Sequence, residues 1–175
     1  MINHGGLSIF GAILAGIISI YVLSKTKKFN FTEHVDVIAV VFPLCQAIGR
    51  FGNYFNQEAY GAPCNSFIKL FVDKEYRYAQ YSNIEYYHPT FLYESMLDII
   101  IFLILFFSLF KFKNLKTGTI TALYLVFYSF VRYFIEGIRI DSVLNVGNYP
   151  IAQIFSILIF VIGLISLILI NKKRT

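Results

Sequence analysis

Long apolar stretches alternate with short polar ones along this chain. The stretches 91–110 and 151–170 each match the roughly 20 residues that a helix needs to cross a bilayer. The stretch 7–23 is slightly shorter, and 118–134 is apolar apart from a late Arg132. Such blocks are typical of membrane-spanning helices rather than of one soluble core.

The charged residues support a fifth and weaker span at 35–48, which is short and contains Asp36, Pro43 and Gln46. Nine of the fifteen Lys and Arg residues form three short clusters, which are Lys25, Lys27 and Lys28; Lys111, Lys113 and Lys116; and Lys172, Lys173 and Arg174. Basic clusters mark the cytoplasmic side of a membrane protein. Five spans put all three clusters on one side, whereas four would move the second cluster outside.

The sequence therefore predicts an all-α, polytopic membrane helix bundle with about five transmembrane helices. The N-terminus is expected outside and the C-terminus in the cytoplasm. The whole chain, 1–175, is expected to form a single integral membrane domain, with an outer loop or head segment at 49–90. The tyrosines of that segment suit a membrane interface, where a ring lies among headgroups and its hydroxyl stays wet.

The composition agrees with this assignment and narrows the partners. The chain is 57% hydrophobic and 14% charged, with a mean hydropathy of +0.65 and a net charge of +5. The basic residues lie at the ends of predicted helices, as topology determinants do, so the expected partner is the lipid bilayer and no nucleic acid is expected. Cys45 and Cys64 lie at different predicted depths and show no metal-ligand spacing, so neither a disulfide nor a metal site is predicted.

The most unusual polar run is GRFGNYFNQEAYG at 49–61, directly after an apolar stretch. Further polar residues fall on the same predicted side of the membrane. The full set is His4, Arg50, Asn53, Asn56, Glu58, His88, Glu94, Asp98, Arg132, Glu136 and Arg139. A charged side chain in hydrocarbon costs at least ~2.5–3.5 kcal/mol, so these groups should face a protein interior or a water-filled cavity.

Helical spacing indicates that several of these residues share one cavity. Tyr128, Arg132, Glu136 and Arg139 follow the spacing of one helix face, and Glu94 and Asp98 are four residues apart. Paired arginines at membrane depth suggest an anionic ligand such as a phospholipid headgroup, because guanidinium groups bind phosphate through two hydrogen bonds.

Structural explanations for the same residues remain open. Arg132 and Glu136 could form an ion pair that only fixes helix packing, and Glu94 and Asp98 could pair or cap locally. His88 could mark a helix start, because Pro89 suits a first helical turn. His4 lies near the chain terminus, where a histidine is often exposed and inert.

The chain resembles the bacterial prolipoprotein diacylglyceryl transferase family. The resemblance rests on HGGL at 4–7, the 49–61 run, HPTFLYE at 88–94, and the stretch 128–141 with its two arginines and glutamate. These pieces occur in the family's order, and the resemblance covers essentially the whole chain. Family members usually have seven spans, two of them before the HGG motif, so the resemblance implies a member that lacks these two spans.

The resemblance implies transfer of the diacylglyceryl group of phosphatidylglycerol to the lipobox cysteine of a prolipoprotein. A thioether forms and glycerol phosphate is released, with no metal and no cofactor. The implied setting is the bacterial plasma membrane, with a multi-pass chain whose active site faces outward. The open alternatives are a non-catalytic truncated family member and a membrane transporter for a small anion.

The resemblance also implies roles for individual residues. The expected catalytic residues are His4 as the candidate base, Arg50 and Arg132 as the phosphate-holding pair, and Tyr128 as an orienting group. Expected substrate-binding or supporting residues are Asn53, Asn56, Glu58, Gly61, His88, Glu94, Glu136 and Arg139. Asn53 and Glu58 could bind headgroup hydroxyls or order the loop, and Gly61 could let the chain turn close to lipid.

Overall fold

A computed structural model describes residues 9–112, 115–140, 145–146 and 149–172. Within these residues the chain forms five α-helices, and each covers one of the predicted apolar stretches. They are α1 (Ile9–Lys27), α2 (Phe31–Phe55), α3 (Thr90–Lys111), α4 (Thr119–Ile138) and α5 (Ile151–Lys172). In the described part of the chain, α2, α3 and α5 are long and apolar enough to cross a membrane. The fold is therefore an all-α membrane helix bundle.

The weakest predicted span lies inside one of the longest helices. α2 begins after Asn30, whose side chain accepts a hydrogen bond from the Thr32 N–H at 3.1 Å. It passes through the buried Pro43 and continues to Phe55. The stretch 35–48 is thus only the middle of α2. The first half of the 49–61 run is helical rather than part of an outer loop.

The helices α2, α3 and α4 pack against one another around a small apolar core. This core consists of Ala39, Val40, Ile101, Leu105 and Ile120. α5 lies closely along α4 at Gly163. A Cβ built on this glycine would lie only 2.8 Å from Val126 Cγ2 and 3.2 Å from the carbonyl oxygen of Ala122. Small residues allow such close helix contact within membranes.

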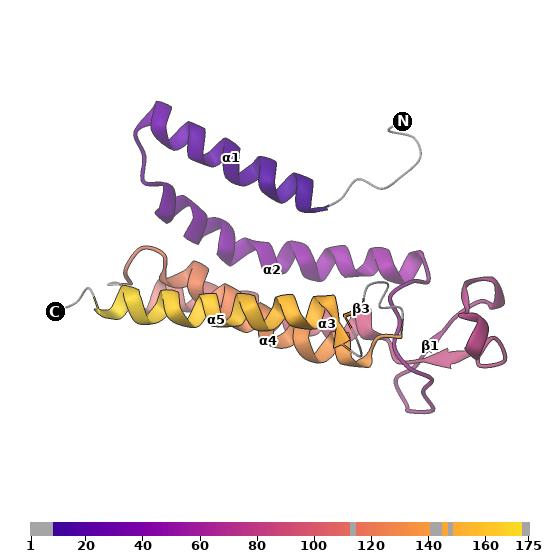
Figure 1. Cartoon of the computed structure of the whole chain (residues 1–175). Helices are drawn as coiled ribbons and strands as arrows, with labels where there is room; N and C mark the ends of the chain where they lie inside the picture. The colour runs from indigo at the N-terminus through magenta and orange to yellow at the C-terminus, as the bar shows by residue number, and fades with distance from the viewer. Residues whose placement is uncertain (1–8, 113–114, 141–144, 147–148, 173–175) are drawn as a thin grey trace.

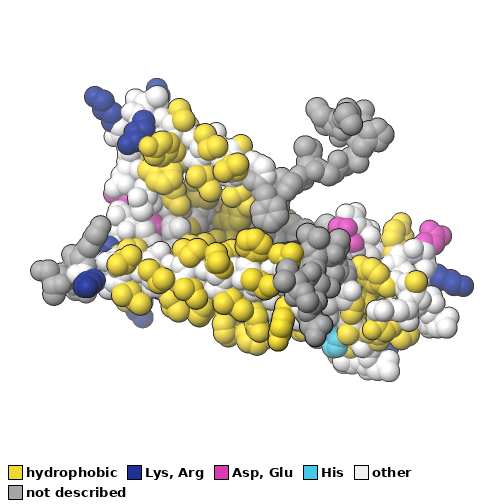
Figure 2. All heavy atoms as spheres, viewed as in Figure 1, with side chains coloured by type: hydrophobic (Ala, Val, Ile, Leu, Met, Phe, Trp, Pro, Cys, Tyr) yellow, Lys and Arg dark blue, Asp and Glu magenta, His cyan; other side chains and the backbone are white. Residues whose placement is uncertain are grey.

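α1 stands apart from this bundle. Figure 1 shows it on the far side of α2 from the other helices, joined to α2 by a turn. Its large apolar side chains are exposed, including Leu14 at 61% and Ile18 at 53%. In Figure 2, apolar side chains also cover the visible surface of the other helices. A surface of this kind suits lipid rather than water.

The two ends of the bundle differ in charge. In Figure 2, most of the visible Lys and Arg side chains lie at the end that holds the α1–α2 turn and the C-terminal end of α5. At this end Lys116 donates a hydrogen bond to the carbonyl oxygen of Ile170 at 2.7 Å, which satisfies part of the last turn of α5. Asp36 of α2 binds the first turn of α4 at the same end.

A small head follows α2 at the opposite end (Figure 1). It contains the antiparallel strands β1 (Leu70–Phe71) and β2 (Tyr86–Tyr87), and the short 3₁₀ helices η2 (Lys74–Tyr76) and η3 (Ala79–Tyr81). A second short pair, β3 (Asn145–Val146) and β4 (Tyr149–Pro150), precedes α5. The sequence pattern did not predict any of these strands.

The head has an apolar core of its own, formed by Tyr60, Leu70, Val72 and Tyr87. The Tyr60 hydroxyl donates to the carbonyl oxygen of Tyr76 at 2.7 Å, so this buried ring has a polar partner. Tyr60 and Tyr87 are at most 1% exposed. For these two tyrosines the expected interfacial position is wrong, because they fill the interior of the head.

Candidate functional site

Glu94 joins the two arginines that were expected to hold an anion. Its carboxylate forms an ion pair with Arg50 of α2 through Oε1, and with Arg132 of α4 through Oε2 at 3.1 Å. The Glu94 side chain is 2% exposed, whereas those of Arg50 and Arg132 are 20% and 17% exposed. The carboxylate is therefore enclosed, while both guanidinium groups keep an accessible part.

The row of charges continues along α4. The second terminal nitrogen of Arg132, Nη2, lies 2.6 Å from Glu136 Oε2, and Arg139 Nη1 lies 3.7 Å from the same oxygen. Glu136 is 5% exposed. Helical spacing predicted that these side chains share one face, and the structure confirms it. The charged row connects α2, α3 and α4 at the head end of the bundle.

Asp98 lies one helical turn from Glu94 on the same face of α3, but its environment differs. It is 0% exposed. Among the described residues, neither of its carboxyl oxygens has a hydrogen-bond partner. It is nevertheless within electrostatic range of Glu94, Arg50 and Arg132.

Tyr128 lies in the same region, one turn from Arg132 on α4. Its ring stacks on that of Tyr124 with centroids 5.6 Å apart, and the Tyr124 hydroxyl donates to Gln46 Oε1 at 2.9 Å. Tyr128 is within electrostatic range of Glu94, Asp98 and both arginines of the cluster. Gln46, Asp98 and Tyr128 thus each lie one helical turn deeper than a member of the charged row, and together with Tyr124 they make up a polar layer.

Sequence reasoning assigned Tyr128 to the site and placed Asp98 in the shared cavity, but it missed Gln46 and Tyr124. The missed signal is periodic, because Gln46 precedes Arg50 by four residues, just as Tyr128 precedes Arg132 by four. Each helix therefore repeats its polar position one turn deeper in the bundle.

Glu58 orders the turn that ends α2. Its Oε1 accepts hydrogen bonds from the side-chain amides of Asn53 and Asn56, both at 3.1 Å. The backbone of this turn is unusual, because Gln57 and Ala59 have positive φ angles of 50° and 57°. These contacts agree with the loop-ordering alternative for Asn53 and Glu58. Binding of headgroup hydroxyls by these residues stays a prediction.

Gly61 approaches protein closely. A Cβ built at this position would lie 2.8 Å from His88 Cβ and 3.0 Å from side-chain carbons of Ile138 and Thr90. Its N–H donates to the carbonyl oxygen of His88 at 2.9 Å. The structure therefore explains Gly61 by the join between the head, α3 and α4. The expected close approach to lipid at Gly61 is not what its surroundings show.

The two histidines of the expected site differ in what can be said of them. His88 lies just before α3, and its Nδ1 is 3.2 Å from the hydroxyl of Tyr93 in the first turn of that helix. His88 is half-buried, and its side-chain hydrogen-bond partner, Tyr93, does not belong to the charged row. His4, the candidate base, lies outside the described residues.

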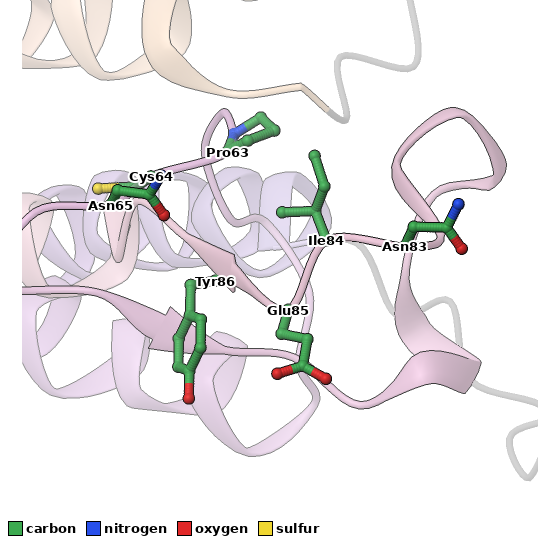
Figure 3. A pocket seen from close by; sticks show the side chains of 7 residues that line it. All are labelled: Pro63, Cys64, Asn65, Asn83, Ile84, Glu85 and Tyr86. Atoms are coloured by element: carbon green, nitrogen blue, oxygen red, sulfur yellow. The ribbon is translucent and has the colours of Figure 1, made fainter.

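A separate pocket of about 450 Å³ lies on the head (Figure 3). Its walls come from the segment before β1 and from the segment that leads into β2. The lining residues are Pro63, Cys64, Asn65, Asn83, Ile84, Glu85 and Tyr86. None of the expected site residues lines this pocket, so the chemistry is better assigned to the charged row.

Comparison with known proteins shows which proteins the whole chain is similar to. Residues 1–169 match the family model described as prolipoprotein diacylglyceryl transferase. The chain is 44% identical over 174 residues to a phosphatidylglycerol–prolipoprotein diacylglyceryl transferase of Clostridium novyi. It is 42% identical over 170 residues to the enzyme of that name from Gloeobacter violaceus, and 45% identical over 161 residues to that from Fervidobacterium nodosum.

These matches cover 99%, 97% and 91% of this chain. They cover 66%, 63% and 54% of the respective relatives. The chain thus spans less than two thirds of the length of each of these relatives.

Proposed function

This chain belongs to the prolipoprotein diacylglyceryl transferase family, and on that premise we propose that it transfers the diacylglyceryl group of phosphatidylglycerol to the lipobox cysteine of a prolipoprotein. A thioether forms and glycerol phosphate leaves. The observation that carries the proposal is the convergence of Arg50 and Arg132 on the enclosed carboxylate of Glu94.

The ion pairs with Glu94 hold the two guanidinium groups close together before any ligand arrives. Arg50 uses only Nη2 in this contact, and its other side-chain nitrogens have no partner among the described residues. A phosphodiester can therefore receive hydrogen bonds from both arginines while Glu94 keeps them in position. Preorganised donors of this kind stabilise the charge that grows on the departing phosphate.

The remaining residues support this pair in the proposed reaction. Glu136 holds Arg132 from the other side, and Arg139 extends the row. The ordered turn of Asn53, Asn56 and Glu58 flanks the helix end that carries Arg50. The substrate supplies the nucleophilic sulfur. His4 stays the candidate base from the sequence.

We further propose that the chain lies in the bacterial plasma membrane with the charged row toward the outer face. The lysine-rich end of the bundle would then lie in the cytoplasm, as the positive-inside rule requires. In this orientation the head and the start of α3 meet the outer leaflet. Phosphatidylglycerol headgroups and the lipobox segment would reach the arginines from there.

The test is a transfer assay with the 175-residue chain in liposomes. The liposomes contain labelled phosphatidylglycerol, and a lipobox peptide with a free cysteine is added. The expected result is label on the peptide in a linkage that resists thioester cleavage. Arg132→Ala should reduce this labelling to background, because Glu94 and Glu136 lose their shared partner and the phosphate loses one guanidinium.

Lys74→Ala provides a matched control, because it removes one exposed positive charge from the head without touching the row. This variant should keep the wild-type rate. Equal activity of Arg132→Ala and the wild type would refute the phosphate-holding role. A folded wild-type chain that labels no peptide would refute the transferase proposal for this chain.

A further inference from the structure

Asp98 is a buried acid that forms no ion pair with Arg50 or Arg132 and has no role in holding them. It is 0% exposed, and its carboxyl oxygens have no hydrogen-bond partner in the described part of the chain. Glu94 and Glu136, by contrast, spend their oxygens on guanidinium groups. A buried polar group without hydrogen bonds is destabilising, so its presence calls for a function.

Charged and titratable groups from three helices interact electrostatically with Asp98. They are Arg50 from α2, Glu94 from α3, and Tyr124, Tyr128 and Arg132 from α4. The two tyrosines differ in one respect. Tyr124 donates its hydroxyl proton to Gln46, whereas the Tyr128 hydroxyl has no hydrogen-bond partner among the described residues. The unused donor of Tyr128 and the unused acceptor of Asp98 therefore lie at the same level of the bundle, one turn below the ion pair of Arg132 with Glu94.

The depth of this pair fits the direction of the proposed reaction. The acyl chains lie in the bilayer, so the carbon to be attacked is on the membrane side of the phosphate. Displacement at that carbon requires the sulfur to enter on the side opposite to the departing oxygen. Asp98 and Tyr128 lie about one helical turn, or ~5.4 Å, below the arginine layer on their own helices. That is the side on which the thiol must be deprotonated.

We propose, building on the function proposed above, that Asp98, in place of the sequence candidate His4, accepts the proton of the lipobox thiol through the hydroxyl of Tyr128. The thiol proton passes to the Tyr128 oxygen while the Tyr128 proton passes to the Asp98 carboxylate. Sulfur bonds to the diacylglyceryl carbon, and the bond from that carbon to the phosphate oxygen breaks. Its electron pair leaves with glycerol phosphate beside Arg50 and Arg132. Asp98 ends protonated, and no other reactant is consumed.

The test compares two lipobox peptides that differ in one atom, cysteine sulfur against selenocysteine selenium. A selenol is largely ionised at neutral pH, so it needs no proton acceptor, whereas a thiol does. The transfer rates of both peptides are measured for the wild-type chain, Asp98→Asn and Tyr128→Phe. Ser95→Ala is the matched control, because Ser95 is also buried on α3 and bonds only the carbonyl oxygen of Ala47.

Asp98→Asn and Tyr128→Phe should slow transfer to the thiol peptide by about a hundredfold or more. Both variants should recover most of the wild-type rate with the selenol peptide. Ser95→Ala should change both rates by the same factor. If Asp98→Asn does not fold, Tyr128→Phe decides by the same ratio, because its ring can keep the stack with Tyr124.

Full thiol activity in Asp98→Asn would overturn the inference, and so would equal losses with thiol and selenol in both variants. These outcomes leave the transferase proposal intact, because the wild-type chain is active in them. A folded wild-type chain that is inactive with both peptides overturns the transferase proposal and the proton path together.

Discussion

The carboxylate of Asp36 on α2 caps the first turn of α4 at Thr121. Oδ1 accepts hydrogen bonds from the Thr121 N–H at 2.8 Å and from the Thr121 hydroxyl at 2.5 Å. Oδ2 accepts from the Gly118 N–H at 2.6 Å. The first N–H groups of a helix have no partner within the helix, and a negative charge complements the helix dipole there.

Asp36→Asn should destabilise the bundle by about 1–2 kcal/mol, because an amide NH₂ would replace one of the two accepting oxygens. Thermal unfolding in detergent micelles measures this change. Glu33→Gln is the control, since Glu33 is exposed on the same end of α2 and only bonds the Asn30 side chain. Equal loss of stability in both variants would contradict the capping role.

Gly61→Ala should destabilise the protein by about 1–3 kcal/mol, because the new methyl group would lie within 3.0 Å of three side-chain carbons. Gly52→Ala offers a contrast within the same sequence run. A Cβ on Gly52 meets nothing within 4 Å and lies in a helix, where alanine is favoured. Gly52→Ala should unfold at the same temperature or higher. Unfolding of both variants in micelles gives the comparison.

Arg132→Lys should lower transfer by at least about tenfold although it keeps the positive charge. Arg132 reaches Glu94 with Nη1 at 3.1 Å and Glu136 with Nη2 at 2.6 Å. A single ammonium group cannot occupy both positions. The liposome assay measures the rate, and far-UV circular dichroism checks that the helices persist. A lysine variant with the wild-type rate would show that charge alone suffices.

Tyr87→Phe should loosen the head by about 1 kcal/mol. The Tyr87 hydroxyl lies 2.9 Å from the carbonyl oxygens of Tyr81 and Ile84, and both would lose this partner. Limited proteolysis of the head segment in micelles reports the change. Cleavage of Tyr87→Phe at the wild-type rate would mean that these hydrogen bonds do not stabilise the head.

The Tyr87 hydroxyl should also make the stability of the head depend on pH in the alkaline range. Burial raises the pKa of the Tyr87 hydroxyl above its usual value of 10.0. The neutral hydroxyl therefore stabilises the folded head fully below about pH 10, and this contribution is lost as pH rises through the folded-state pKa. Protease sensitivity of the wild type should increase in that range more than that of Tyr87→Phe.

Apolar blocks and basic clusters were sufficient to predict all five helices, because a bilayer imposes length and composition directly on the sequence. The end of α2 was harder to locate. Gly49 and Gly52 suggest a loop, yet both continue the helix to Phe55. The two-residue strands of the head could not be predicted, because they are too short to show an alternating pattern.

Within the site, regular spacing along one helix was visible in the sequence, and contacts between helices were not. The spacing of Arg132, Glu136 and Arg139 predicted a shared face. The pairing of Arg50 with Glu94 joins residues 44 positions apart and needs the packed bundle. Asp36 made the predicted span at 35–48 look doubtful because its hydrogen-bond partners lie 82 and 85 residues away in the chain and cannot be found without the packed bundle.

The row of ion pairs also bears on how this chain enters a membrane during synthesis. Arg50 precedes Glu94 in the chain, and Arg132 follows it. A carboxylate that enters hydrocarbon alone carries a penalty of roughly 2.5–3.5 kcal/mol. Because α2 emerges first, Arg50 is already in the membrane when α3 inserts, and it can pair with Glu94 at once. Arg132 then enters against an acid that is in place, so Glu94 and Arg132 each have a partner when they reach the bilayer.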